Sequence, residues 1–236
     1  MGSTPERELR LLTEGGLELV GQIVRSSNET FLVNLSLGEQ TGQAVYKPVA
    51  GERPLSDFPP GLHRRERAAY LLSEELGWGL VPPTVIREDA PLGEGSLQWF
   101  VDCDFREHYF TISSEDPSTH PDMARMALFD YLANNTDRKS GHVLRGNDKR
   151  IWGIDHGLCF SAIFKLRTVI WDFAGEPIPE ALLADIAPLA SAVPAALAEL
   201  LDGDEVSALQ RRTQRMLDGA ILPVDLTGSR YPWPLV

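Results

Sequence analysis

The spacing of apolar residues changes along this chain and separates a strand-rich first half from a helical second half. Two β-rich runs, 17–24 and 30–37, flank the polar stretch RSSNE, and a third run follows at 42–49. This pattern predicts an antiparallel hairpin followed by a third strand. Beyond residue 120 the apolar residues recur with a helical period. Because strands and helices are segregated along the chain, we predict an α+β fold.

The remaining segments extend this pattern. The apolar stripe of LHRRERAAYLLSEELG predicts a helix that ends at Gly77, and VPPTVIRED and SLQWFVDCD predict two more strands. The polar segment REHYFTISSEDPSTHPD is expected to be a connection. The second half should then contain an amphipathic helix, a short hairpin around the turn GNDK, and a group of Ala- and Leu-rich helices. These predicted elements cover 121–135, 142–155 and 178–219.

The composition and net charge limit the range of possible functions. The chain has 236 residues, of which 43% are hydrophobic, enough to form the core of one large domain or of two lobes that share a cleft. Its net charge of −12 disfavours nonspecific binding to nucleic acid and stable association with anionic membranes. No apolar run is long enough to span a membrane, and the first residues do not resemble a secretory signal, so we expect a cytoplasmic location.

The two cysteines give no sign of a disulfide framework or a zinc site. Cys103 and Cys159 each lie in an apolar stretch, and they do not have CxxC spacing. We therefore expect two reduced thiols.

A group of acids and bases follows the predicted helix at 121–135. It reads Asp137-x-Lys139-x-x-His142, and Asp155 comes thirteen residues after His142, at the end of the predicted hairpin. Two carboxylates and one further ligand suit a divalent metal that bridges phosphate groups. The pattern indicates phosphoryl transfer, in which Asp137 would orient a hydroxyl and Lys139 would neutralise phosphate oxygens.

Four motifs make the sequence resemble the protein-kinase-like superfamily, and within it the phosphatidylinositol 3- and 4-kinase branch. NNTDRK, with its Asp-x-Lys-x-x-His run, is similar to the catalytic loop, and IDHG stands where the metal-binding Asp-Phe-Gly motif lies. AVYKP resembles the strand that carries the ATP lysine, and RRERAAYLL resembles the helix that carries its glutamate partner. The resemblance covers roughly residues 17–160.

The resemblance implies a two-lobed protein-kinase-like fold within a single domain, 1–236. An N-terminal sheet with one helix would form the lobe 1–103, with a hinge near 98–103, and a mainly helical lobe would cover 104–236. It also implies that ATP and Mg²⁺ or Mn²⁺ bind between the lobes.

The same resemblance assigns roles to individual residues. Lys47 would hold the nucleotide phosphates and Glu66 would orient Lys47, although Glu74 or Glu75 could make this pair instead. Asp137 would be the catalytic acid residue, and Asp155 would bind the metal together with His142.

The hinge backbone at Phe100 and Val101 would bind adenine, and the ring of Trp99 or Phe100 would cover it. Ser26 and Ser27 would lie over the phosphates.

Two departures from the family pattern leave alternatives open. The loop over the phosphates has no glycine. His142 stands where the family has asparagine, and imidazole suits Mn²⁺ or Zn²⁺ better than Mg²⁺, so either the metal preference shifts or the site holds a single ion. The predicted activity is transfer of the γ-phosphate to a hydroxyl of a soluble small molecule, an inositol-type lipid or a protein, with Lys165 and Arg167 available to an anionic acceptor. The alternatives are a nucleotide-binding pseudokinase, an AMP transferase, and a fold without nucleotide whose charges only solvate turns.

Overall fold

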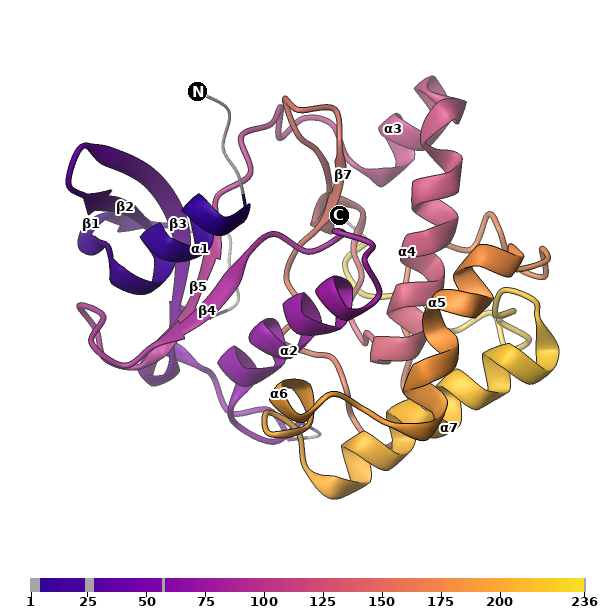
Figure 1. The fold of residues 1–236 in the computed structure, drawn as a ribbon. Helices are drawn as coiled ribbons and strands as arrows, with labels where there is room; N and C mark the ends of the chain where they lie inside the picture. Colours follow the sequence, from indigo (N-terminus) through magenta and orange to yellow (C-terminus); the bar gives the residue numbers. More distant parts are fainter. Residues whose placement is uncertain (1–4, 24–27, 57, 236) are drawn as a thin grey trace.

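The computed structural model describes residues 5–23, 28–56 and 58–235 and contains an antiparallel sheet beside a helical half (Figure 1). The sheet has five strands in the order β1-β2-β3-β5-β4. Helix α2 lies between the sheet and the helices of the C-terminal half (Figure 1). The elements of this first half are α1 (Pro5–Glu14), β1 (Gly16–Gln22), β2 (Phe31–Leu37), β3 (Gln40–Pro48), the 3-10 helix η1 (Val49–Gly51), α2 (Leu62–Glu75), β4 (Thr84–Arg87) and β5 (Gly95–Trp99).

Strand β3 distributes its side chains over two faces of the sheet. Ala44 and Tyr46 are fully buried in a cluster that includes Leu11 and Leu12 of α1. Because side chains alternate along a strand, Lys47 lies on the opposite face. Helix α1 therefore covers one face of the sheet and leaves the lysine on the other.

Helix α2 belongs to the core of the C-terminal half as much as to the sheet. Its apolar residues Ala69 and Leu72 are fully buried in one cluster with Leu128 and Leu209 of the later helices. The helix also contacts β4, β5 and α6. The apolar core thus crosses the division at the hinge, and that division into lobes stays a prediction.

The C-terminal half is mainly helical, with a short hairpin at its junction with the sheet (Figure 1). In this hairpin β6 pairs with β7 in antiparallel fashion. The elements are α3 (Tyr109–Glu115), η2 (Pro117–Thr119), α4 (His120–Ala133), η3 (Ser140–His142), β6 (Val143–Arg145), β7 (Ile151–Gly153), α5 (Glu180–Ser191), α6 (Ala195–Ala198) and α7 (Gly203–Gly219).

Helix α3 lies where the sequence predicted only a connection. Its short length hides any helical period, since it buries just two residues, Tyr109 and Ile112. Its start is fixed by a reciprocal capping interaction between His108 and Thr111. Local caps and two buried side chains were enough to form this helix, and hydrophobic periodicity could not reveal it.

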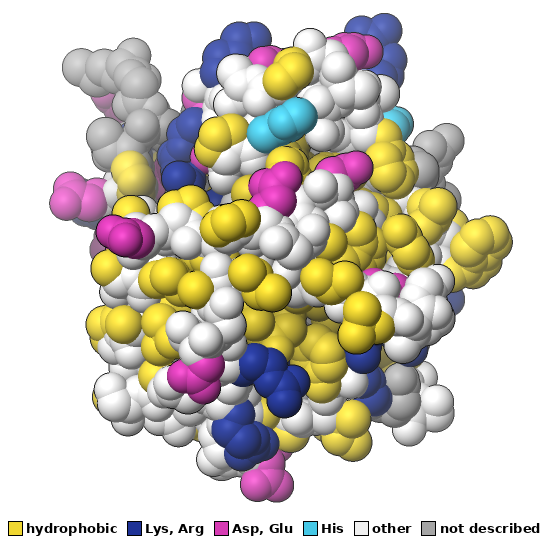
Figure 2. All heavy atoms as spheres, turned by 90° about the vertical axis from the view of Figure 1, so that its right-hand side faces the viewer, with side chains coloured by type: hydrophobic (Ala, Val, Ile, Leu, Met, Phe, Trp, Pro, Cys, Tyr) yellow, Lys and Arg dark blue, Asp and Glu magenta, His cyan; other side chains and the backbone are white. Residues whose placement is uncertain are grey.

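The outer face of the C-terminal half carries many apolar side chains. Figure 2 shows this face, on which yellow side chains are widespread. Helix α5 illustrates the cause, because it buries Ile186 and Leu189 and leaves Ala181, Ala184 and Ala187 exposed. An Ala-rich helix therefore exposes small apolar groups even when its larger side chains are in the core.

The α+β fold with an antiparallel sheet is confirmed, and so are the first hairpin and the α2, α4 and α7 helices. Cys103 and Cys159 are free thiols, as expected. Over the described ranges, no helix has the length and apolarity that a membrane span requires.

Leu72→Ala should lower the free energy of unfolding by about 2–5 kcal/mol, because it removes a fully buried side chain from the larger core cluster. Leu71→Ala on the same helix is the matched control, since Leu71 is only partly buried. Urea unfolding followed by circular dichroism measures both. Equal losses in the two variants would contradict this account of the core.

Candidate active site

The catalytic-loop segment starts where α4 ends, and asparagine fixes its first turn. Asn134 adopts the left-handed conformation, with φ of 49°, which Asn tolerates better than most residues. Its side-chain amide donates to the carbonyl oxygens of Ser161 and Ile163, both at 2.8 Å, and its side-chain oxygen accepts from the N–H of Lys165 at 2.9 Å. One amide thus holds the segment after Asp155 against the loop.

A buried ion pair with α4 also holds the same loop in place. Arg138 and Asp130 have fully buried side chains, and their nearest ion-pair atoms are 2.9 Å apart. Arg138 also donates to the carbonyl oxygens of His142 at 3.1 Å and Ile154 at 2.9 Å. These two carbonyls belong to the two segments that carry Asp137 and Asp155. The pair therefore sets the distance between the segments.

Sequence reasoning missed this ion pair. A signal was present, because Asp130 is a single acid in the apolar run MALFDYLA. A charge there is costly unless a partner is buried with it. Nothing in the sequence identifies Arg138 as that partner, since its neighbour Lys139 carries the same positive charge.

Lys47 joins the two halves of the site. Its ammonium group forms an ion pair with Oε1 of Glu66, and it lies 2.8 Å from Oδ1 of Asp155. Burial opposes the charged ammonium, but Asp155 and Glu66 outweigh it and raise the pKa of Lys47. Burial would raise the pKa of Asp155, but the Lys47 ammonium outweighs burial and lowers it. Half of the Asp155 side chain is open to solvent, so water screens this pairing.

Asp155 has a strained backbone, and Glu66 supports the residue after it. Asp155 has φ of 60°, a region that residues with a side chain rarely adopt. The backbone N–H of His156 donates to Oε2 of Glu66 at 3.0 Å. The Glu66 carboxylate therefore contacts Lys47 with one oxygen and the Asp155 segment with the other.

Asp137 lines the same cleft as Glu66. Its Oδ2 is 2.9 Å from the ammonium group of Lys139. Burial raises its pKa, and this effect outweighs the opposing influence of Lys139. A carboxylate with a raised pKa is a better base than an exposed one. Its backbone N–H donates to Oδ1 of Asn135 at 3.0 Å, which orients the residue.

His142 and Asp155 present two unprotonated atoms to one point. Burial lowers the pKa of His142 to about 4, so its ring is neutral at pH 7. Nδ1 lies 3.0 Å from the carbonyl oxygen of Asp137 and 3.5 Å from the backbone N–H of Lys139, and we assign the proton to Nδ1 because the contact with the carbonyl is the shorter one. Nε2 then has a lone pair that faces Oδ2 of Asp155 at 3.4 Å. Two facing acceptors of this kind suit a bound cation.

The donor set of this position is small. Within the described ranges, no group of three or more His, Cys, Asp and Glu side chains could hold a metal. A nitrogen and a carboxylate oxygen fit a divalent ion that takes its remaining ligands from phosphate and water. His142 and Asp155 are therefore compatible with the predicted role, which stays a prediction.

The strand register corrects the expectation for Trp99. Trp99 pairs with Ala44, and Lys47 pairs with Ser96, so the Trp99 ring lies on the α1 face of the sheet. It packs there with the N-terminal core, where a Cβ on Gly42 would meet the indole at 2.3 Å. The ring cannot cover a base on the Lys47 face. Gln98 instead faces the same side of the sheet as Lys47, and no sequence motif pointed to this residue.

The two residues of the predicted hinge that follow Trp99 differ in their backbone hydrogen bonds. The N–H of Phe100 donates to the carbonyl oxygen of Gln43 at 3.0 Å, so it is not available to a ligand. The Phe100 ring lies against Phe105, with centroids 5.9 Å apart. The N–H of Val101 has no acceptor within the part of the chain that is described, so its predicted role in binding adenine stays a prediction.

The other predicted residues have different outcomes. Ser26 and Ser27 lie outside the described residues. Glu66, and not Glu74 or Glu75, pairs with Lys47. Arg167 is exposed beside the loop, where its backbone carbonyl accepts from Arg138.

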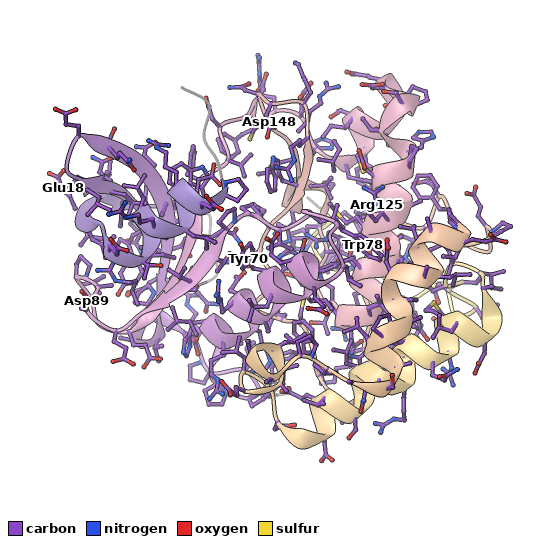
Figure 3. The ribbon with its side chains drawn as sticks, in the orientation of Figure 1. Glu18, Tyr70, Trp78, Asp89, Arg125 and Asp148 are labelled. Carbon is purple, nitrogen blue, oxygen red and sulfur yellow. The ribbon has the colours of Figure 1, made fainter. Side chains whose placement is uncertain are left out.

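A larger hollow of about 410 Å³ lies elsewhere, behind the hinge. It is lined by residues of α2, the hinge and the β6–β7 turn, among them Tyr70, Trp99 and Asp148. Figure 3 labels Tyr70 on α2 and Asp148 at the β6–β7 turn. Lys47, Glu66, Asp137 and Asp155 line a different and smaller cleft, whereas the predicted adenine-binding residues Trp99, Phe100 and Val101 line this hollow. We place the site by the four charged side chains and not by cavity size.

The chain has a close relative in Mycobacterium tuberculosis. The protein Rv2133c of strain H37Rv is 42% identical over 264 residues, an alignment that covers 96% of this chain and 95% of that protein. This chain belongs to the Rv2133c family. No protein-family model matches the sequence.

Solved structures show which fold this member of the Rv2133c family has. The Golgi casein kinase with Mn and ADP bound matches with a TM-score of 0.60 at 16% identity, over 98% of this chain and 80% of that one. Hydra Fam20 with sugar matches with 0.61 at 14%, over 91% and 87%. The Helicobacter pylori proinflammatory kinase CtkA matches with 0.52 at 10%, over 89% and 94%. The Rv2133c-family chain therefore has a protein-kinase-like fold.

His142 should make the metal-free protein less stable as the pH falls below about 6.5. Its pKa is about 4 in the fold and 6.5 ordinarily, so between these values the unfolded chain binds more protons. The contribution is complete above pH 6.5 and is lost toward pH 4, by up to about 1.4 kcal/mol per pH unit.

The measurement is urea unfolding with chelator between pH 4.5 and 7. His156 shifts in the same direction, so the wild type is compared with His142→Asn, which should have the shallower slope. Identical slopes would show that His142 is not buried in its neutral form.

Proposed function

We propose that the protein is an ATP- and divalent-metal-dependent phosphotransferase that moves the γ-phosphate to a hydroxyl. One observation carries the proposal: Lys47, Glu66, Asp137 and Asp155 all line a single cleft, although they are scattered over more than a hundred residues of sequence. The cleft contains an ammonium group for phosphate, a candidate base and a carboxylate for a cation. Phosphoryl transfer needs this combination of positioning and charge neutralisation.

Each side chain has a definite task in this proposal. Lys47 binds the phosphates and exchanges its contact with Asp155 for contacts with phosphate oxygens. Glu66 keeps Lys47 in place through their ion pair. Asp137 accepts the proton of the acceptor hydroxyl, for which its raised pKa suits it. Lys139 neutralises charge on the transferred group.

The cleft must rearrange when it takes a nucleotide. Its free volume is about 40 Å³, room for little more than water, because the Lys47 ammonium lies between two carboxylates. A triphosphate would therefore displace the Lys47–Asp155 contact. Asp155 then needs a new positive partner, and a divalent cation held by Asp155 and His142 would be that partner.

The metal proposed for this position is Mn²⁺ in preference to Mg²⁺. An imidazole nitrogen is a better ligand for Mn²⁺ than for the harder Mg²⁺. The crystal structure of the Golgi casein kinase, with a similar fold, contains Mn and ADP, which supports the pairing of nucleotide and manganese. When bound, the ion would neutralise phosphate charge.

The finer assignments are also proposals. The motifs NNTDRK and AVYKP support a place in the phosphatidylinositol 3- and 4-kinase branch. The net charge of −12 supports a soluble small molecule or a protein as acceptor, and a cytoplasmic location without nucleic-acid or stable membrane partners.

Asp137→Asn should lower the rate of phosphate transfer by about 10²–10⁴-fold, because the amide cannot accept the proton. ATP binding should remain, since Lys47 and Asp155 are unchanged. Release of phosphate from γ-labelled ATP, with water as acceptor, measures the rate. Thermal shift with ATP and Mn²⁺ measures binding. Asp218→Asn, an exposed site on α7, is the control.

The wild type also tests the competing functions in the same assay. Label from α-labelled ATP on AMP or on an acceptor, with release of pyrophosphate, would indicate AMP transfer, whereas γ-phosphate transfer leaves the α label on ADP. A thermal shift without turnover would indicate a pseudokinase. No shift at millimolar ATP with either metal would refute nucleotide binding altogether.

His142→Asn should move the metal preference from Mn²⁺ toward Mg²⁺, because an amide oxygen is a harder ligand than imidazole. The measurement is the concentration of each metal that gives the half-maximal rate. His120→Asn, remote from the cleft on α4, is the control. An unchanged ratio of the two concentrations would remove His142 from the metal site.

A further inference from the structure

Arg65 is the sequence neighbour of Glu66 on α2, and it contacts different parts of the fold. Its guanidinium forms an ion pair with Glu205 of α7. Its Nε donates to the carbonyl oxygen of Cys159 at 3.1 Å, in the segment that follows Asp155. The ring of Phe58 stacks on the guanidinium at 5.0 Å. Arg65 therefore ties α2 to α7 and to the Asp155 segment at once.

This ion pair is buried and geometrically specific. Both side chains are only 6% exposed. Glu205 has a second task, because its other carboxylate oxygen accepts from the N–H of Asp202 and caps α7. A planar guanidinium with a partner fixed in this way tolerates little displacement. Buried pairs of this kind often add little stability, but they can specify one arrangement.

Other contacts hold the rest of α2 against the C-terminal helices. Trp78, just after the helix, donates from Nε1 to Oδ2 of Asp185 on α5 at 2.8 Å, and Figure 3 labels Trp78 in this region. Arg64 donates to the carbonyl oxygen of Glu199 near α6. With Ala69 and Leu72 in the C-terminal core, the helix is fixed along its length.

We propose that Arg65 and Glu205 are positioning residues that hold α2 against the C-terminal half, so that Glu66 stays on Lys47 without a separate activating event. This inference rests on the proposed function, because the Lys47–Glu66 pair matters for catalysis only if the protein transfers phosphate. In phosphotransferases of this fold the Lys–Glu pair must be in place for transfer, and movement of its helix is a control point. Here the helix is fixed by an ion pair within the folded chain.

The first test compares Arg65→Gln with Arg211→Gln, an exposed arginine on α7. Arg65→Gln should loosen α2 next to Glu66 and weaken the contact between Glu66 and Lys47, although the other contacts still hold the rest of the helix. Without its ion pair to Glu66, the Lys47 side chain should be more accessible and should react several-fold faster with an amine-reactive reagent. The rate is read from the Lys47 peptide by mass spectrometry at several pH values. Glu66→Gln gives the labelling rate of Lys47 when the ion pair with Glu66 is lost completely. Arg211→Gln should label Lys47 at the wild-type rate.

The phosphate-transfer rate is the second readout. If α2 shifts by about 1 Å, kcat should fall by about 10²-fold. Arg65→Lys keeps the charge but cannot reach Glu205 and the Cys159 carbonyl together, so its kcat and labelling should be intermediate. A purely structural role would lower the melting temperature and leave both readouts unchanged in the folded protein.

Arg65→Gln leaves Glu205 buried without its partner, and this variant could fail to fold. The double variant Arg65→Met with Glu205→Gln removes both charges and keeps the carbonyl that caps α7. It should fold, and it should still label faster at Lys47 and transfer phosphate more slowly. Wild-type labelling and rate in this variant would overturn the proposal.

The labelling readout needs no nucleotide, so the two proposals fail separately. If the wild type neither binds ATP nor turns it over, the proposed function fails while the labelling still tests the role of Arg65. If the wild type is active and the Arg65 variants keep its labelling and rate, only the positioning role fails.

Discussion

The site depends on the fully buried ion pair between Asp130 and Arg138. Asp130 belongs to α4, and Arg138 reaches from the catalytic loop to the carbonyls of His142 and Ile154. A charge at this depth is tolerated only with a hydrogen-bonded partner, so the loop must place Arg138 against Asp130. The position of Asp137 relative to Asp155 follows from that requirement. Helix packing thus determines the spacing of the two acids.

The sheet and the helical core meet at α2, and this helix positions Lys47 through Glu66. Glu66 contacts the Lys47 ammonium and the His156 N–H with its two carboxylate oxygens. Its neighbour Arg65 contacts Glu205 and the Cys159 carbonyl. Two consecutive residues therefore connect the strand lysine with both the Asp155 segment and α7. The N-terminal sheet alone does not contain a complete phosphate site.

Sequence reasoning found the elements and the residues with local signals. Strand alternation located β3, helical periodicity located α2 and α4, and motif order brought Lys47, Glu66, Asp137 and Asp155 into one hypothesis. It could not find Arg138 or Arg65, because a buried arginine and an exposed one look alike in sequence. It misplaced the Trp99 ring, since the face of a strand residue depends on its register with the neighbouring strand. Helix α3 was missed because it buries only two side chains.

The double contact of Lys47 has a thermodynamic consequence. Its ammonium pairs with both Glu66 and Asp155, so each of these two carboxylates has a positive partner within the chain. A nucleotide that takes over Lys47 leaves Asp155 without a counter-ion, while a cation that takes over Asp155 frees Lys47 for phosphate. Nucleotide and cation should each increase the affinity of the other by the same factor, so that the cleft responds to their joint presence.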